Sequence, residues 1–283
     1  MNAGFKAGAF GAVLAGAAVG VAFYSHQRAM QQAEDAWRRI ASRSTSAPER
    51  FSPAMVAELP EIGRRYFNYA IEPGTPLLTT VELEMDGTFL LGDRQSHQTY
   101  SMQARQILQP PSQFVWIPRL QSGMMRITGS DALVGGEAWT RFWLLGLVPV
   151  ADSRSSPDLV RSAAFRSAME GIWVPACLLP RHGVTWEQTG PNEARLHFTK
   201  LSPTLILRLA LAPDGSVREV VGERWSNANA DQQFRLQPFG GTIHGNDRFG
   251  GYRIPTNVRV GNHYGTADYL PFFQARVRGA RFL

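Results

Sequence analysis

Several segments of this chain alternate apolar and polar side chains, and this alternation limits the fold more than any other feature. Polar residues separate Val81, Leu83 and Met85, and the same spacing recurs over residues 100–105 and 205–211. Successive side chains of a β-strand point to opposite faces, so each segment fits a strand with one buried face. The sequence therefore predicts a mostly antiparallel sheet.

A few helices are predicted beside the strands. Ser156-Pro157-Asp158 supplies a capping serine, a proline at the first helical position and an acid in the first turn, a typical helix start. Short helices are predicted at residues 53–59 and 60–70. Asp86-Gly87 is predicted to form a turn, and the apolar run Trp139–Val150 is either a fully buried strand or a cavity wall. We expect an α+β fold.

The N-terminal segment Ala7–Tyr24 carries no charged residue. Its length of about 18 residues is at the lower limit for a helix that crosses a bilayer. We interpret it as a membrane anchor, and a cleaved signal peptide with a weak site at Gly20-Val21-Ala22 is the alternative. Small residues recur at every fourth position, so another helix could approach this side closely. The predicted helix-docking residues are Gly8, Ala12, Gly16 and Gly20.

The anchor divides the chain into three predicted parts. Residues 1–41 form the transmembrane helix and a juxtamembrane extension with Trp37 and Ile40 on its apolar side. Residues 42–53, rich in serine, proline and arginine, form a linker. Residues 54–283 are long enough for a single β-rich domain with its own core.

The charge of the chain favours membrane lipids over nucleic acid as a partner. The formal charge is +6 and the isoelectric point about 9.9, but no run of five or six basic residues occurs. Lys6 followed by an apolar run resembles an export signal, although the arginines after the run favour a cytoplasmic domain. We expect a single-pass protein of the bacterial inner membrane with a periplasmic domain. The single Cys177 excludes an internal disulfide.

No catalytic or cofactor motif is found, and no cofactor or metal is expected. The nucleophile elbow, the phosphate loop and the paired-histidine zinc motif are all absent. Cys177 and His182 could form a thiol nucleophile and its base, but the apolar neighbours of the cysteine favour an inert buried thiol. His244, Asp247 and His263 are the best metal candidates, and isolated histidines are more often merely hydrogen-bonded.

Six of the seven tryptophans fall in the predicted β-rich domain. They are ordinary core material, but a curled sheet with an apolar inner face can also hold one ligand. Glu170 is expected either to pair with Arg224 or Arg253 inside this interior or to be a solvated charge at its rim. The predicted ligand-binding residues are Trp116, Trp139, Trp143, Trp173, Trp186, Trp225, Glu170 and Arg224.

A series of short motifs resembles a bacterial domain family of unknown function over residues 55–283. The motifs are Ser162-Ala163, Trp173-x-Pro175, Leu178-Leu179-Pro180, Val184-x-Trp186, Asp214-Gly215, Gly250-Gly251-x-x-Ile254-Pro255 and an aromatic C-terminal strand. The resemblance implies a membrane-anchored domain whose curled antiparallel half-barrel is similar to that of the lipoprotein-carrier proteins. It implies no catalytic residue.

The preferred hypothesis is a non-enzymatic, membrane-tethered module that binds or shields a lipid or another apolar ligand. The alternative is an accessory or scaffold subunit that docks on a membrane-protein partner through its N-terminal helix. An open apolar groove favours the first and a solid core the second. A hydrolase assembled by the fold comes third, and a cavity with converging ionisable side chains would favour it.

Overall fold

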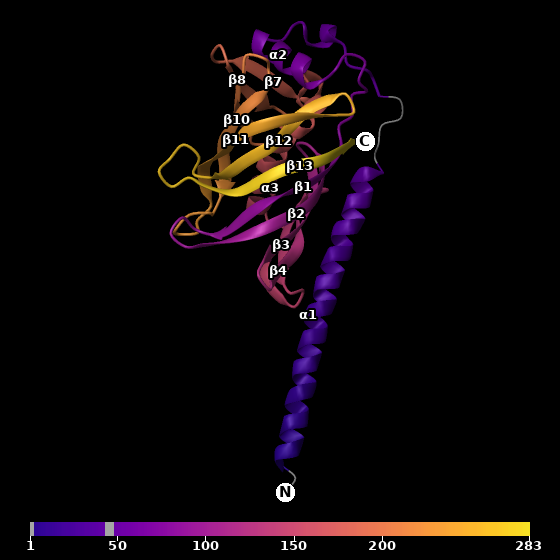
Figure 1. The fold of residues 1–283 in the computed structure, drawn as a ribbon, viewed down its shortest axis with the longest axis vertical. Coiled ribbons are helices and arrows are strands. Elements are labelled where there is room, and N and C mark those ends of the chain that lie inside the picture. The colour runs from indigo at the N-terminus through magenta and orange to yellow at the C-terminus, as the bar shows by residue number, and fades with distance from the viewer. Residues whose placement is uncertain (1–2, 43–47) are drawn as a thin grey trace.

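A single thirteen-stranded antiparallel sheet forms the body of the protein (Figure 1). The computed structural model describes residues 3–42 and 48–283, with side chains described from Gly20 onwards. The strands are β1 Val81–Gly92, β2 His97–Gln109, β3 Gln113–Ser122, β4 Met125–Val134, β5 Glu137–Leu144, β6 Val148–Ser153, β7 Val184–Gln188, β8 Glu193–Phe198, β9 Leu205–Leu211, β10 Val217–Ser226, β11 Arg235–Phe249, β12 Tyr252–Asn262 and β13 Leu270–Phe282.

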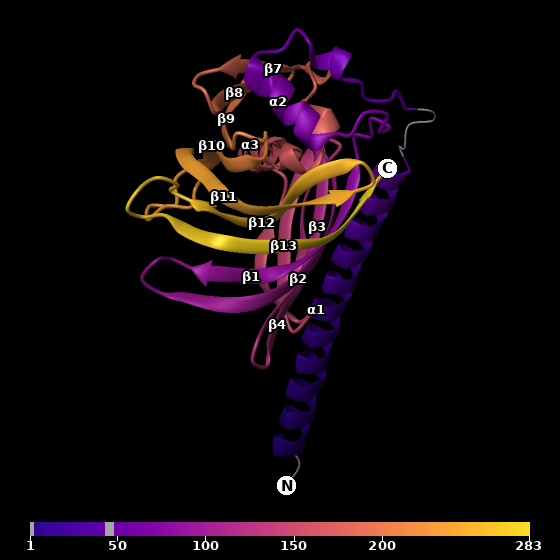
Figure 2. The same cartoon turned by 45° about the horizontal axis from the view of Figure 1, so that its top comes forward.

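Two meanders of consecutive strands build this sheet, and they meet where the first strand pairs with the last. The order runs from β6 back to β1, continues with β13 and then descends to β7. The register between β1 and β13 extends from Val81 opposite Phe282 to Phe89 opposite Phe273. β6 and β7 are the two edges, so the sheet is curled but not closed (Figure 2). A mostly antiparallel curled sheet is the architecture that the alternating pattern predicts.

The chain between the two edge strands fills the concave side of the sheet. It forms α3 Pro157–Met169 and the 3₁₀ turns Glu170–Trp173, Pro175–Leu178 and Pro180–His182 (Figure 2). The predicted start of α3 is correct: the Ser156 side chain accepts a hydrogen bond from the Leu159 amide at 3.2 Å. A smaller helical layer, the 3₁₀ turn Pro53–Val56 and α2 Glu61–Ala70, lies near β7 and β8 at one end of the sheet (Figure 1).

The outer face of the sheet is covered by the N-terminal helix α1, Ala3–Ala41 (Figure 1). Its last turns bury Ala33, Ala36 and Ile40 against β2, β3 and β4, in a cluster that includes Val115 and Trp139. The predicted juxtamembrane part of the helix is therefore packed on the sheet. The helical stripe of apolar residues was read correctly, but it faces a second apolar stripe on the sheet.

Polar contacts along α1 strengthen the same packing. Trp37 donates its indole Nε1–H to Glu82 at 2.8 Å, and the Arg105 guanidinium lies 4.9 Å from the Trp37 ring. Arg105 also pairs with Glu34. Trp37 is therefore held against the sheet by both a hydrogen bond and a cation–π contact.

The predicted membrane anchor, Ala7–Tyr24, forms part of α1. Within the described residues, no helix combines the length and apolar content that crossing a bilayer requires. The surroundings of Gly8, Ala12 and Gly16 on the helix lie outside the described part of the structure. Gly20 is exposed, with open space around the position that a Cβ would take.

Two local predictions were wrong for reasons of tertiary structure. Asp86-Gly87 is not a turn but the middle of β1, where a Cβ on Gly87 would lie 1.9 Å from the Gln274 carbonyl oxygen of β13. Of the two alternatives for Trp139–Val150, the single buried strand is wrong: a turn at Leu145 and Gly146, both with positive φ, separates β5 from β6, and part of β5 lines a cavity. Because β6 is a sheet edge, its Val148 is 55% exposed despite its apolar character.

The packing of α1 predicts the effect of trimming its buried side. Ile40→Ala should lower the free energy of unfolding by about 2–4 kcal/mol, because it leaves a cavity beneath α1. Gln31→Ala, on the exposed side of the same helix, should change it by less than about 0.5 kcal/mol. Urea unfolding of the full chain checks both, and an equal effect of the two substitutions would contradict the packing.

Candidate functional site

A cavity of about 270 Å³ remains between the concave face of the sheet and α3. Six aromatic side chains from β1, β3, β5, β11 and β13 form much of its wall: Phe89, Trp116, Phe142, Phe239, Phe272 and Phe273. Their rings touch in sequence, with Trp116 5.8 Å from Phe89 and Phe89 5.4 Å from Phe272 between ring centres. The cavity is thus an apolar space inside the half-barrel.

The strand register places a row of polar and aromatic residues along one side of this cavity. Gln106 of β2 lies opposite Trp116 of β3, which lies opposite Asp131 of β4, which lies opposite Thr140 of β5. Directly opposed residues share one face of a sheet. Four residues that are distant in the sequence therefore meet on the concave face.

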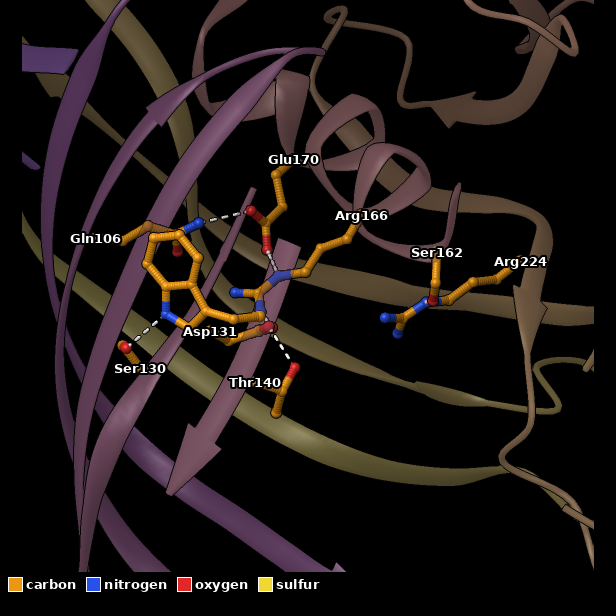
Figure 3. Close-up of polar contacts among 9 residues, drawn as sticks. Gln106, Ser130, Asp131, Thr140, Ser162, Arg166, Glu170 and Arg224 are labelled. Carbon is orange, nitrogen blue, oxygen red and sulfur yellow. Dashed lines mark hydrogen bonds and ion pairs between the residues drawn. The ribbon is translucent and has the colours of Figure 1, made fainter. Parts of the chain in front are cut away.

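Arg166 of α3 reaches this row and forms the centre of a buried ion cluster (Figure 3). Its Nε donates to Glu170 Oε1 at 2.8 Å, and its Nη1 pairs with Asp131 Oδ2. Thr140 donates to Asp131 Oδ1 at 2.7 Å, and Gln106 donates to Glu170 Oε2 at 2.6 Å. Every oxygen of the two carboxylates thus accepts a hydrogen bond from within the protein.

The two carboxylates around Arg166 favour the protonated, charged form of its guanidinium. Burial alone would lower the pKa of the guanidinium, but Glu170 and then Asp131 oppose it, and the pKa lies above its ordinary value. The Arg166 guanidinium also lies 4.6 Å from the Phe114 ring and 5.2 Å from the Trp116 ring. The cluster ties α3 to the sheet beside the apolar wall.

A second arginine, Arg224 of β10, enters the cavity from the opposite meander (Figure 3). Its Nε donates to Ser162 Oγ of α3 at 3.1 Å, and its guanidinium lies 4.8 Å from the Phe239 ring. Among residues 3–42 and 48–283, no carboxylate forms an ion pair with it. Burial, and next the charge of Arg166, lowers the pKa of Arg224 to about 10, so it stays protonated at neutral pH.

Four predicted ligand-binding residues line the cavity: Trp116, Trp173, Glu170 and Arg224. The predicted ion pair between Glu170 and Arg224 does not form, since Arg166 takes the carboxylate and Arg224 bonds to Ser162. Arg253, the other proposed partner, lies 4.5 Å from the Tyr69 ring.

The other four predicted tryptophans do not line this cavity. Trp139 lies beneath α1 and bonds to Ser130, Trp143 lies 5.2 Å from His26, Trp186 packs on Tyr66 and Phe67, and Trp225 donates to Asp158 at 2.7 Å. Sequence alternation cannot tell the two apolar faces of this sheet apart, because α1 covers one and α3 the other.

Sequence reasoning missed Arg166 and Asp131. The first had a local signal: Arg166 precedes Glu170 by four residues on a predicted helix, a spacing that favours an ion pair. Asp131 had none, because only the sheet register brings it to the cluster.

The predicted alternatives for catalysis and metal binding find no support in the geometry. Burial raises the pKa of Cys177 far above its ordinary value, and its thiol bonds to the Thr79 carbonyl at 3.3 Å, as expected for an inert buried cysteine. His244 bonds to Thr242, and His263 to the Ala228 carbonyl. Nowhere in the described chain do three or more potential metal ligands gather.

The ion cluster predicts a strong effect of removing its cation. Arg166→Met should lower the free energy of unfolding by about 3–5 kcal/mol, because it leaves Asp131 and Glu170 buried without a partner. Arg248→Met, which breaks the exposed pair with Glu72, should change it by no more than about 1 kcal/mol.

A triple variant separates lost charge balance from lost packing. Arg166→Met combined with Asp131→Asn and Glu170→Gln should be more stable than Arg166→Met alone, because no uncompensated charge remains. Chemical denaturation of the variants measures this, and equal stabilities would contradict a charged cluster.

Comparisons with solved structures find remote likenesses. A LolA superfamily protein from Nitrosomonas europaea is 8% identical over 78% of this chain and 92% of its own, with a TM-score of 0.43. A DUF1329 family protein from Desulfovibrio piger is 10% identical over 78% and 90%, with a TM-score of 0.40. A putative outer membrane lipoprotein-sorting protein domain from Vibrio parahaemolyticus is 10% identical over 81% and 91%, with a TM-score of 0.33.

Sequence comparison gives the family. None of the curated proteins compared with the chain matches it. The model of a family of unknown function (DUF6544) matches residues 49–275, which is most of the chain, and the protein therefore belongs to this family, in agreement with the resemblance of its motifs.

Proposed function

We propose that this protein is a non-enzymatic binding module that takes a lipid or another apolar ligand into the cavity between α3 and the concave face of the sheet. The observation that carries the proposal is the state of the aromatic wall. Phe89, Phe142, Phe272 and Phe273 are only half-buried although they line one interior space. Apolar side chains gathered around a partly open cavity mark a binding site more often than a finished core.

The size and lining of the cavity fit part of an acyl chain or a similar small apolar group. Its volume of about 270 Å³ is close to the lower end of ordinary ligand pockets. Each methylene group transferred from water into such a space contributes roughly 0.8 kcal/mol. A bound ligand would cover the exposed parts of the four half-buried phenylalanine rings.

The ion cluster in the same cavity does not favour the hydrolase alternative. Asp131 and Glu170 converge there, but each of their four oxygens already accepts a hydrogen bond from Arg166, Thr140 or Gln106. A general base needs a free oxygen within reach of the proton that it takes. The cluster holds α3 to the sheet and leaves the apolar wall available. The scaffold alternative is weaker too, since it called for a solid core.

The proposal includes a place for the protein at a bacterial membrane, with the domain on the periplasmic side. Its basis is the sequence alone: Lys6 precedes the apolar segment Ala7–Tyr24. An apolar ligand dissolves poorly in water, so a module attached to a membrane would meet its ligand where the ligand is abundant.

Filling the cavity should weaken ligand binding. The neutral fluorophore N-phenyl-1-naphthylamine should bind the delipidated full-length protein saturably, with enhanced emission. Val260→Trp places an indole inside the cavity and should weaken this binding about tenfold or more, as crowding of about 1–3 kcal/mol implies. Ile206→Trp, at an exposed position of β9, should leave it unchanged.

Two results would count against binding in this cavity. One is the absence of saturable binding to the wild-type protein, together with no apolar molecule found by mass spectrometry in protein purified without delipidation. The other is equal binding by Val260→Trp and Ile206→Trp.

A further inference from the structure

Hydrogen-bond donors of Arg224 and Trp116 in the cavity have no acceptor among the described residues. The four carboxylate oxygens of Asp131 and Glu170 all accept internal hydrogen bonds. By contrast, Arg224 uses only its Nε, toward Ser162, and its two Nη groups have no partner in the described part of the chain. Arg224 is half-buried, so these Nη groups remain open to an acceptor from outside the protein.

The charge of Arg224 points in the same direction. Arg166 pairs with both carboxylates, so Asp131 and Glu170 act on Arg224 only from beyond ion-pair distance. The two arginines and two carboxylates of the cavity sum to zero charge, but Arg224 has no carboxylate in direct contact among the described residues. An anionic group at its Nη atoms would form a charge-assisted hydrogen bond.

The position of Arg224 suits the head of an amphiphile. Its guanidinium is fixed by Ser162 of α3 on one side and lies 4.8 Å from the ring of Phe239, which belongs to the aromatic wall. A second donor lines the same cavity: the buried Nε1 of Trp116 has no acceptor among the described residues. The hydrogen-bond donors of Arg224 and Trp116 therefore line the same partly open cavity as the aromatic rings.

We propose that the ligand of this cavity is an anionic amphiphile, whose carboxylate or phosphate head binds the Nη groups of Arg224 while its chain lies against the aromatic wall. The inference rests on the proposed function and specifies its ligand. A planar guanidinium can donate two parallel hydrogen bonds to either kind of head.

Three ligands with one chain and different heads test the inference: oleate, oleyl phosphate and oleyl alcohol. Each ligand is titrated into the wild-type protein with bound N-phenyl-1-naphthylamine, and its affinity is read from the displacement of the fluorophore. At least one anion should bind about 10- to 100-fold more tightly than the alcohol, as a charge-assisted hydrogen bond implies. Oleate and oleyl phosphate distinguish a fatty acid from a phospholipid source.

Variants at Arg224 assign the preference to this side chain. Arg224→Met should remove the preference for the anions and leave the affinity for the alcohol and the fluorophore unchanged. Arg224→Lys should restore part of it, because it keeps the charge but loses the planar fork. Arg218→Met is the matched control, with the same loss of charge at an exposed position of the same strand.

The outcomes separate this inference from the proposed function. If the fluorophore binds but the three heads compete equally, the anionic head is wrong and the apolar site stands. If Arg224→Met weakens the binding of the alcohol and of the anions equally, Arg224 acts only as a structural link to α3 and the inference is overturned. If nothing binds the wild-type protein, both proposals fail.

Discussion

The pairing of β1 with β13 is the contact on which the rest of the structure depends. It joins the two ends of the sheet-forming chain and makes one thirteen-stranded surface out of two meanders. The close approach at Gly87, where no side chain would fit against the β13 backbone, lets both strands pass through this junction. The same register sets Phe89 opposite Phe273, so the junction also creates part of the aromatic wall. Without this pairing, the cavity would lack the part of its wall that Phe89 and Phe273 form.

Two helical layers then cover the two faces of the sheet for different reasons. On the outer face α1 supplies small and aliphatic side chains, and the contact is tight, with Ala33, Ala36 and Ile40 almost fully buried. On the concave face α3 carries Arg166, whose ion pairs fix the helix at one point beside Trp116. A buried ion cluster has a demanding geometry and does not fill space as a hydrocarbon does. The cavity lies beside this ion cluster, which contributes Asp131, Arg166 and Glu170 to its lining.

The sequence predicted the sheet, the start of α3 and the family, because each depends on local signals. Alternation fixes which segments become strands, and Ser156 caps α3 as its position implied. Of the candidate site, Trp116, Trp173, Glu170 and Arg224 were found, but Trp139, Trp143, Trp186 and Trp225 lie elsewhere. Trp139 and Trp143 lie on the face beneath α1, and an apolar side chain in a strand that is buried on both faces does not reveal which face it occupies. Trp186 and Trp225 instead contact α2 and α3 away from the cavity.

What the sequence determined by itself was the set of elements and their amphipathic character, since these arise from side-chain spacing within a few residues. Only the tertiary structure decided that α1 packs on the outer face, that Arg166 rather than Arg224 neutralises Glu170, and that Asp131 joins them. These outcomes depend on strand register and on contacts between residues that are distant in the chain. That Arg224 is the cavity arginine without a directly paired carboxylate among the described residues is visible only once the partners have been assigned in space.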